Sequence, residues 1–554
     1  MTERPPSLLS VLTRTLASLP GLLRNWVAPN LHQFRESRQL TLWALALLIG
    51  AGVAVGAIAF RELIGVFQLF WLGSRSERVV TAAANLPFYM LLLGPVIGGI
   101  IVGQLLGRLQ ARRTGGVADV MEARALSGRR LSKREGAWSA LITTLSLGFG
   151  ASAGREGPVV HLGATMASAL SDRAKLPEWC RRTLLGAGVA SAISASFNAP
   201  IAGVLFAHEV ILGHYSMRSF VPIVISSAAG SVLSRLWFGD MVSFVVPRYQ
   251  ITSYCEFPAF ALLAIVCALV AILFQFSLFA TDYVARRVTM PLWLRPVIGG
   301  AMVGAIAIAF PEILGVGYEA TTRALWNDLP LALMLALIIA KTAATAITLA
   351  SRFGGGVFSP ALYLGAMTGG AFGAMAAAVF PDLASSGGLY AILGMGAVAA
   401  AVLGAPISTT MIVFELTGGY GLSVALLLSC AVAHGINQAI HGHSFFHWQL
   451  EMRGLFLQAG PHQHFLSSIR VADFMQMTDP DKDTEPYDPE TGTPSLKPTD
   501  RLEAALRTFD AGGHDRLPVV DPDNTTRIIA WASQNRALRA YNGALVTASE
   551  EEHR

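Results

Sequence analysis

Charged side chains are scarce in this sequence. Asp, Glu, Lys and Arg make up 14% of the 554 residues, whereas 53% are hydrophobic and 54 are glycine. A soluble domain carries about 25% charged residues, so this composition excludes an ordinary soluble protein and predicts a multi-pass membrane protein. Several apolar runs approach the ~20 residues that span a bilayer: 40–60, 90–106, 220–238, 260–279 and 331–350.

Cysteine is scarce as well, and the histidines complete no metal motif. The four cysteines lack the spacing of a disulfide framework or a zinc site: Cys180, Cys255, Cys267 and Cys430. His208 and Glu209 begin a pattern similar to the HExxH of membrane-embedded zinc proteases, but Leu212 takes the place of the second histidine and His214 comes too late. An intramembrane metalloprotease is therefore an alternative that a zinc assay would detect. We predict no metal and no cofactor, because no carboxylate or thiol completes a second histidine group: His441, His443 and His447.

Positive charge is concentrated in a few short loops. The net charge is +5, from 41 Lys and Arg against 36 Asp and Glu. Basic loops favour the cytoplasmic side of a membrane. The basic residues are spread over separate short loops, whereas a nucleic-acid-binding surface has them clustered in one patch. The first 39 residues carry no signal-peptide pattern. We therefore predict an inner-membrane or plasma-membrane protein with both termini cytoplasmic, and with these basic segments on the same side: 24–38, 108–134, 173–182 and 286–287.

One acidic residue, Glu156, interrupts an apolar stretch. It lies in GFGASAGREGP (148–158), where small residues end a long apolar run and an Arg-Glu pair precedes Gly-Pro. Charge inside a membrane segment tends to face a cavity or an ion pathway, and a helix N-terminus offers unpaired N–H groups to an anion. We interpret Glu156 as a built-in competitor for an anion site. The simpler alternative is a first-turn acid that only stabilises the helix dipole.

The sequence repeats itself in two halves. NAPIAGVLFAHE (198–209) and GAPISTTMIVFE (404–415) share Ala-Pro-Ile and the same spacing from Pro to Glu. A Gly-x-Gly precedes each, at 186–188 and 394–396, and a glycine-rich stretch that ends in proline lies further upstream. Matched halves with broken helices are typical of transporters whose binding site lies between the repeats. We therefore expect one central site.

Three motifs together resemble the CLC family of chloride channels and chloride/proton exchangers. GREGP (154–158), NAPIAGVLF (198–206) and GGVFSP (355–360) are similar to that family's signature stretches and follow its order, within a match over about residues 40–460. The resemblance implies an all-α membrane domain of two inverted halves with broken helices. It also implies a homodimer with one anion pathway in each subunit.

The resemblance also implies roles for individual residues. The backbone amides of Arg155, Glu156 and Gly157 would form an external chloride site, and those of Val357 and Phe358 a central one. N–H dipoles suit a monovalent anion because they bind it without a full countercharge. Glu156 would be the gate, since its carboxylate occupies an anion position and swings away when it is protonated or displaced. The intact GREGP and Phe358 give no special reason to expect a fluoride exporter.

Two positions at the central site depart from the family pattern. TGGVA (114–118) stands where the family has Gly-Ser-Gly-Ile-Pro, so Gly115 replaces a serine hydroxyl. Phe446, in GHSFFHWQL (442–450), replaces a tyrosine hydroxyl. Each unmade hydrogen bond would cost about 1–3 kcal/mol, so we expect weaker chloride binding or looser selectivity. An alignment error of one or two residues, above all at Phe446, is the alternative.

A third departure concerns protons. Exchangers of the family usually carry two acids after the Asn-Ala-Pro helix, and the second relays protons to the gate. Here Glu209 matches the first acid, and Val210 replaces the second. This favours passive, channel-like conduction. The alternative is a chloride/proton antiporter with another proton route, for which His208 is a candidate because histidine titrates near neutral pH.

The last part of the chain is polar enough for the cytoplasm. Its pattern predicts strand, helix, strand, strand and helix over 471–475, 496–509, 517–521 and 528–538, an order similar to one CBS domain. Such modules normally work in pairs, so a single copy indicates pairing across a dimer. In such modules an aspartate commonly binds the ribose of a nucleotide, and Arg536 stands at that position here. A dimer-stabilising tail is therefore favoured over a nucleotide site.

These observations predict four segments and one function. The segments are a cytoplasmic arm (1–39), two membrane repeats (40–240 and 241–460) and a small α+β cytosolic domain (461–554). The function is transmembrane chloride transport gated by Glu156, in contact with membrane lipid, with protons as a second transported ion in the antiporter alternative. We predict neither an enzyme nor a nucleic-acid partner.

Overall fold

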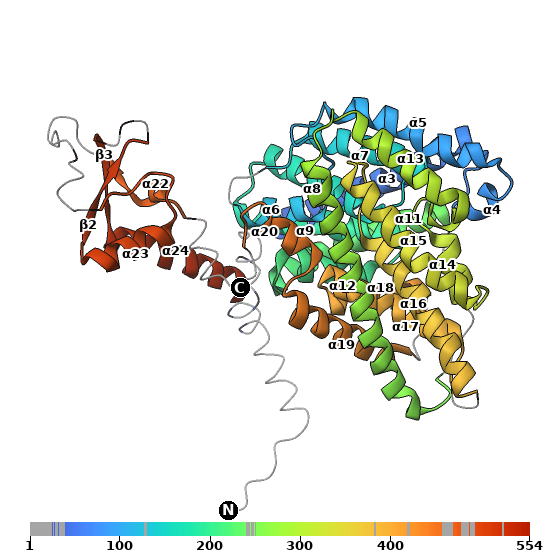
Figure 1. Cartoon of the computed structure of the whole chain (residues 1–554). Helices are drawn as coiled ribbons and strands as arrows, with labels where there is room; N and C mark the ends of the chain where they lie inside the picture. The colour runs from blue at the N-terminus through green and yellow to red at the C-terminus, as the bar shows by residue number, and fades with distance from the viewer. Residues whose placement is uncertain are drawn as a thin grey trace, which may run out of the picture.

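The fold consists of a large helical body and a small α+β unit (Figure 1). The computed structural model describes residues 39–456 and 469–553 apart from short gaps, together with residues 21, 25, 27 and 32. The gaps are 127–129, 240–243, 245–248, 250, 382–383, 418–421, 478–486, 488–493, 523 and 525. The predicted N-terminal arm lies almost wholly outside the described residues.

The helical body has two halves, each a series of membrane helices and shorter helical segments. The first contains α3 (Gln39–Leu72), α4 (Val79–Ala83), α5 (Phe88–Leu106), α6 (Val117–Ala125), α7 (Lys133–Gly148), α8 (Glu156–Arg173), α9 (Glu178–Phe197), α10 (Pro200–Phe206), the π-helix η2 (Ala207–Leu212) and α11 (Met217–Phe238). The second contains η3 (Tyr254–Glu256), α12 (Phe257–Arg287), α13 (Leu294–Ala309), η4 (Pro311–Ile313), α14 (Tyr318–Leu325), α15 (Leu331–Ala350), α16 (Phe358–Val379), α17 (Gly387–Leu403), α18 (Pro406–Thr417), α19 (Ser423–His441) and α20 (Phe445–Glu451).

The packing of the two halves follows one pattern. In the first half α9 packs against α3, α8, α10 and α11, and in the second α17 packs against α12, α16, α18 and α19. Equivalent helices also meet each other, because α5 packs on α13 and α10 on α18. The repeat that the sequence predicts is therefore a repeat of helix contacts.

The repeated Ala-Pro-Ile motif marks the same chain reversal in both halves. Asn198 ends α9 and Gly404 ends α17, both with a left-handed backbone, at φ 56° and 71°. Asparagine and glycine tolerate that conformation and end helices in this way. Pro200 and Pro406 then begin the next helices, where the missing N–H of proline would have no helical partner.

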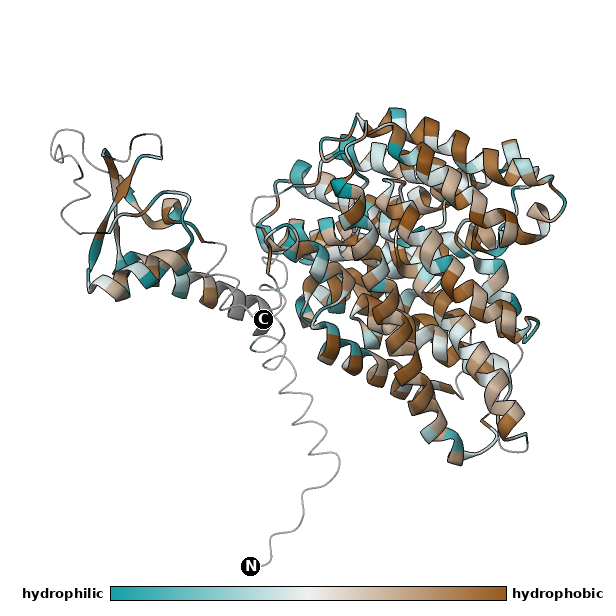
Figure 2. Ribbon diagram, in the orientation of Figure 1, coloured by the Kyte–Doolittle hydropathy of each residue, from teal (hydrophilic) through white to brown (hydrophobic). Residues whose placement is uncertain are grey.

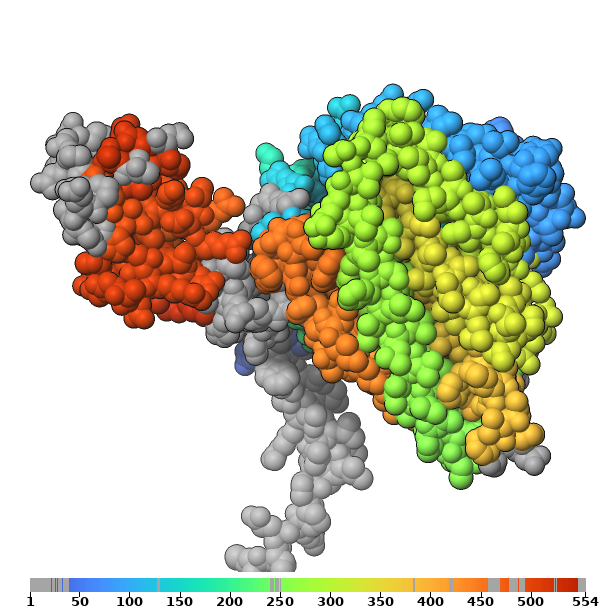
Figure 3. All heavy atoms as spheres, in the orientation of Figure 1, coloured from blue at the N-terminus to red at the C-terminus, as the bar shows by residue number. Residues whose placement is uncertain are grey.

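Long apolar helices make the body a multi-pass membrane protein. Seven described helices are long and apolar enough to cross a bilayer, among them α3, α5, α11 and α15. The runs at 40–60 and 260–279 prove longer than predicted, because they lie in continuous helices over Gln39–Leu72 and Tyr254–Arg287. Apolar residues cover the helices of the body (Figure 2), and α12 lies beside α19 on one of its faces (Figure 3). Outward side chains of α12 are apolar, as lipid contact requires: Leu262, Ile265, Leu269, Leu273 and Phe276.

The α+β unit has its own core and one element that differs from the prediction. It contains α22 (Val471–Phe474), β1 (Gln476–Met477), α23 (Leu502–Gly512), β2 (Arg516–Val520), β3 (Ile528–Ser533) and α24 (Gln534–His553), with antiparallel strands in the order β1-β3-β2. The predicted strand over 471–475 is wrong. Asp473 accepts a hydrogen bond from the backbone N–H of Arg470 at 2.8 Å, which stabilises a helical turn and leaves only Gln476 and Met477 for the strand.

Candidate functional site

Two helix N-termini meet in the middle of the body. Gly154 and Gly356 exchange backbone hydrogen bonds of 2.7 and 2.8 Å, directly before α8 and α16. These are the helices that the GREGP and GGVFSP motifs begin. The first N–H groups of a helix have no partner inside it, so the bridge brings two sets of unpaired donors together.

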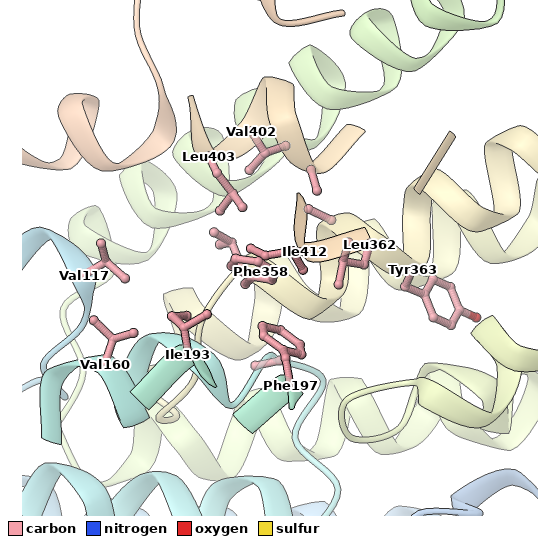
Figure 4. Packing of buried hydrophobic residues seen from close by; sticks show 14 of the residues in the cluster. Val117, Val160, Ile193, Phe197, Phe358, Leu362, Tyr363, Val402, Leu403 and Ile412 are labelled. Carbon is pink, nitrogen blue, oxygen red and sulfur yellow. The ribbon is translucent and has the colours of Figure 1, made fainter. Parts of the chain in front are cut away.

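A cavity of about 650 Å³ lies against these helix ends, and we call it the large cavity. Six of the predicted site residues line it: Gly115, Glu156, Gly157, Val357, Phe358 and Phe446. Figure 4 shows Phe358 of α16 together with three further lining side chains, from α6, α8 and α9: Val117, Val160 and Ile193. The structure thus brings the two predicted anion-binding motifs and both departures from the family pattern to one cavity.

A second cavity, of about 250 Å³, is lined by two residues that contact Glu156, and we call it the small cavity. Arg155 and Tyr318 line it, and Glu156 does not. The Tyr318 hydroxyl donates to Glu156 Oε1 at 3.2 Å. Glu156, which lines the large cavity, is therefore hydrogen-bonded to Tyr318, which lines the small cavity.

Glu156 itself is almost completely buried, with 1% of its surface exposed. The Ser359 hydroxyl donates to the same Oε1 at 2.5 Å, and Arg155 Nε lies 4.0 Å from it. The sequence prediction missed Ser359 and Tyr318 as partners of Glu156. Ser359 was within reach of sequence reasoning because it follows Phe358 in the GGVFSP motif. Tyr318 was not, since it is 162 residues away and no motif marks it.

Ion pairs hold the start of α6 at the rim of the large cavity. Asp119 pairs with Arg113 at 2.6 Å and with Arg453 at 3.0 Å, and Arg453 also pairs with Glu122 at 2.8 Å. Burial raises the pKa of Asp119, but the hydrogen bond and charge of Arg113 and the charge of Arg453 outweigh burial, so this pKa lies well below its usual range. The carboxylate stays ionised and fixes the loop that carries Gly115.

An imidazole fills the space beside Gly115. A Cβ atom at Gly115 would lie 2.4 to 2.6 Å from three ring atoms of His161, which is buried on α8. The serine typical of the family would not fit beside this ring. The glycine and the histidine therefore form a matched pair, which explains the departure that the sequence shows at position 115.

Restoring the serine is expected to destabilise the protein. Gly115→Ser forces the His161 ring to move within a packed site, at a cost of about 1–3 kcal/mol. Thermal unfolding of the purified protein in detergent measures this loss. In the His161→Ala background the ring is absent, so Gly115→Ser should cost little stability. The double variant should therefore be nearly as stable as His161→Ala alone. Equal stability of Gly115→Ser and the parent protein would contradict this account.

The predicted proton-relay position, Glu209, has a structural role in this conformation. Its carboxylate accepts hydrogen bonds from the backbone N–H groups of Ile407 at 3.2 Å and Ser408 at 2.7 Å, at the start of α18. In the other half, Glu415 accepts from the start of α10 at 3.1 and 2.7 Å. Each repeat thus caps a helix of the other, which explains the Pro-to-Glu spacing. Neither Glu209 nor Val210 lines the large or the small cavity.

Three of the histidines singled out in the sequence have local polar partners. His208 Nδ1 lies 3.1 Å from the carbonyl of His214, His443 pairs with Glu451 at 3.2 Å, and His447 lies 2.9 Å from the Ser444 hydroxyl. Within the described ranges, no group of three His, Cys, Asp or Glu side chains is arranged to hold a metal ion.

The fold and the site together define a class. Two equivalent halves of membrane helices direct helix N-termini at one buried carboxyl group, which lines one cavity and is hydrogen-bonded to a residue that lines another. This is the architecture of a membrane transport protein for small anions. A family model described as voltage gated chloride channel matches residues 98–438. The chain belongs to this family, the CLC family. It is a multi-pass CLC-type chloride transport protein, and membership of a family of channels and transporters excludes the enzyme alternative.

Individual relatives agree with the family model. A ClcB-like chloride channel protein of Ralstonia nicotianae is 33% identical over 399 residues, which cover 71% of this chain and 92% of the relative. The voltage-gated ClC-type chloride channel ClcB of Escherichia coli is 28% identical over 411 residues, with coverage of 73% and 97%.

Solved structures show the same fold. A slow cyanobacterial Cl⁻/H⁺ antiporter has a TM-score of 0.67 at 20% identity, over 74% of this chain and 97% of the other. A eukaryotic CLC transporter has a TM-score of 0.65 at 18% identity, over 91% and 89%. The predicted fold class, an all-α membrane protein with two inverted halves and a small α+β domain, is confirmed.

Proposed function

We propose that this protein conducts chloride passively through the large and small cavities, with Glu156 as the gate. The observation that carries this proposal is the position of the Glu156 carboxyl. It lines the large cavity and is bonded to Tyr318, which lines the small cavity. An ion that passes from one cavity to the other has to displace this side chain.

The charges around the large cavity support an anion as the transported ion. Three acidic residues line it, Glu156 included, against six arginines: Arg112, Arg113, Arg286, Arg295, Arg352 and Arg453. A cavity lined mostly by one sign of charge raises the local concentration of the opposite ion. Chloride therefore accumulates at the level of the gate.

Unpaired backbone donors would then hold the ion. The amides of Arg155, Glu156 and Gly157 form the proposed external site, and those of Val357 and Phe358 the proposed central site. Support comes from the Gly154–Gly356 bridge, which brings both helix starts to the same place. Two positions of the central site carry a side-chain hydroxyl in the family. In this chain they are Gly115 and Phe446, which have no hydroxyl, so backbone N–H groups are the donors that we propose for the central site.

The absence of a proton-relay acid favours a channel over an antiporter. Val210 cannot carry a proton, and Glu209 uses its carboxylate to cap α18. The second candidate is a chloride/proton antiporter with another proton route, and it is favoured by the description of the cyanobacterial neighbour as a Cl⁻/H⁺ antiporter.

Flux measurements distinguish the two candidates. Purified protein in liposomes with an imposed chloride gradient should carry current that reverses at the chloride equilibrium potential, without proton uptake. A reversal potential displaced toward the proton equilibrium potential, with protons driven uphill by chloride, would reject passive conduction and establish the antiporter. His208→Ala then tests the substitute relay.

The wider assembly is part of the proposal. We propose a homodimer in the inner or plasma membrane with both termini cytoplasmic, on the strength of the basic loops and of the CLC fold. The α+β unit, which resembles a single CBS domain, would pair across this dimer and stabilise it. Nucleotide binding to this unit is the alternative.

A further inference from the structure

Two hydroxyl groups from separate elements hold the Glu156 carboxyl. Tyr318, the first residue of α14, and Ser359, in the first turn of α16, both donate to Oε1. The other oxygen, Oε2, is buried and has no hydrogen-bond partner among the residues that the structure describes. Within the part of the chain that the structure describes, Tyr318 and Ser359 are therefore the two hydrogen-bond donors to this carboxyl group.

The surroundings of Tyr318 fix its ring in place. Gly317, directly before it, has φ +91°, a conformation that favours glycine. The Arg155 guanidinium lies 4.9 Å from the ring centroid, and Phe244 packs edge-on at 5.2 Å. The hydroxyl is therefore held by packing on two sides and by the turn that precedes it.

A buried lysine ties the loop before Tyr318 to the segment before Glu156. Lys341 Nζ donates to the carbonyl groups of Ile313 and Gly315, each at 2.9 Å. The Ser152 hydroxyl donates to the same Ile313 carbonyl at 2.7 Å. Glu156 and its tyrosine partner are thus positioned by one connected network.

We propose that Tyr318 and Ser359 form a hydroxyl clamp that holds the Glu156 gate closed and sets the pH at which the pathway opens. This proposal rests on the proposed function of Glu156. Hydroxyl donors stabilise the ionised form of a carboxyl group. Both donors therefore hold the Glu156 carboxylate in the position that this structure shows.

The charged and titratable groups near Glu156 are few. They are Arg155, 4.0 Å from Oε1, Glu77, which pairs with Arg155, and Tyr318 itself. Arg61 completes the set by pairing with Glu77 at 2.8 Å. Tyr318→Phe and Ser359→Ala remove a hydroxyl group but none of these charged groups, so such variants test the clamp separately from the ion pairs.

The test is the pH dependence of chloride efflux from proteoliposomes. Tyr318→Phe and Ser359→Ala should each move the midpoint of activation upward by about one pH unit, and the double variant should move it further. Ser359→Thr keeps the hydroxyl and should restore the midpoint of the parent protein. Tyr390→Phe is the matched control, because it removes a buried Tyr–Glu hydrogen bond of 3.1 Å, to Glu256, outside both cavities. Its midpoint should not move.

The outcomes separate the clamp from the gate. If Glu156→Gln removes the pH dependence but Tyr318→Phe and Ser359→Ala keep the midpoint of the parent protein, or lower it, the clamp is rejected while the gate stands. If Glu156→Gln leaves the pH profile intact, the gate itself is rejected. In the Glu156→Gln background neither clamp variant should change the profile, and a shift there would show that the hydroxyls act on another group.

Discussion

Replacing Glu156 with glutamine is expected to make chloride transport independent of pH. Glutamine keeps the length and shape of the side chain but cannot ionise, so it cannot compete with chloride as an anion. It also loses the charge that strengthens the hydrogen bonds from Tyr318 and Ser359. Efflux near pH 7.5 should rise about tenfold or more, the factor that ~1.4 kcal/mol produces, and should stay level down to about pH 4.5.

A second buried glutamate provides the control. Glu256 accepts hydrogen bonds from Tyr390 and Ser385 and lines neither cavity. Glu256→Gln therefore changes a similar site without touching the pathway and should keep the pH profile of the parent protein. An unchanged pH profile in Glu156→Gln, or an altered one in Glu256→Gln, would be incompatible with Glu156 as the gate.

Replacing Gly365 with alanine is expected to destabilise the fold severely. Gly365 on α16 and Gly394 on α17 lie against each other, and a Cβ atom at Gly365 would stand 2.2 Å from the carbonyl oxygen of Gly394. Backbone atoms of packed helices cannot move aside as a flexible side chain can, so the two helices would separate. We expect a loss of about 3 kcal/mol or more, together with a displaced Phe358 at the start of α16.

The measurement is the yield of folded protein and its thermal unfolding in detergent. Gly435→Ala on α19 is the matched control, because nothing lies within 4 Å of its added Cβ. That variant should gain about 0.5–1 kcal/mol from helix propensity. If Gly365→Ala were as stable as Gly435→Ala, the close approach of α16 and α17 would not be a constraint on the sequence.

The repeat shows why so much of this fold could be predicted. Gly163 and Gly188 make the same close approach between α8 and α9 in the first half, where each added Cβ would lie 2.5 Å from the partner's carbonyl oxygen. Such positions accept only glycine, and helix starts after a chain reversal favour proline. Each constraint allows one residue type at one position, so it leaves the same letter in both halves of the sequence.

The partners of the site residues were harder to predict. Glu209 has the same spacing from proline as Glu415, yet its capping role appears only when α10 and α18 meet. His161 explains Gly115, although the two residues are 46 positions apart in different elements. The strand predicted over 471–475 is a helical turn, and the Asp473 carboxylate accepts a hydrogen bond from the Arg470 N–H at its start.

The sequence by itself determined the membrane class, the two halves and the helix breaks, because hydropathy, glycine and proline act over a few neighbouring residues. It also singled out Glu156 as the candidate gate. Only the tertiary structure decided what Glu156 touches. Tyr318 and Ser359 reach it from two other helices, α14 and α16, and the two cavities form between helices that are remote in the chain. Contacts across such separations depend on how whole helices pack, and no short pattern of residues encodes them.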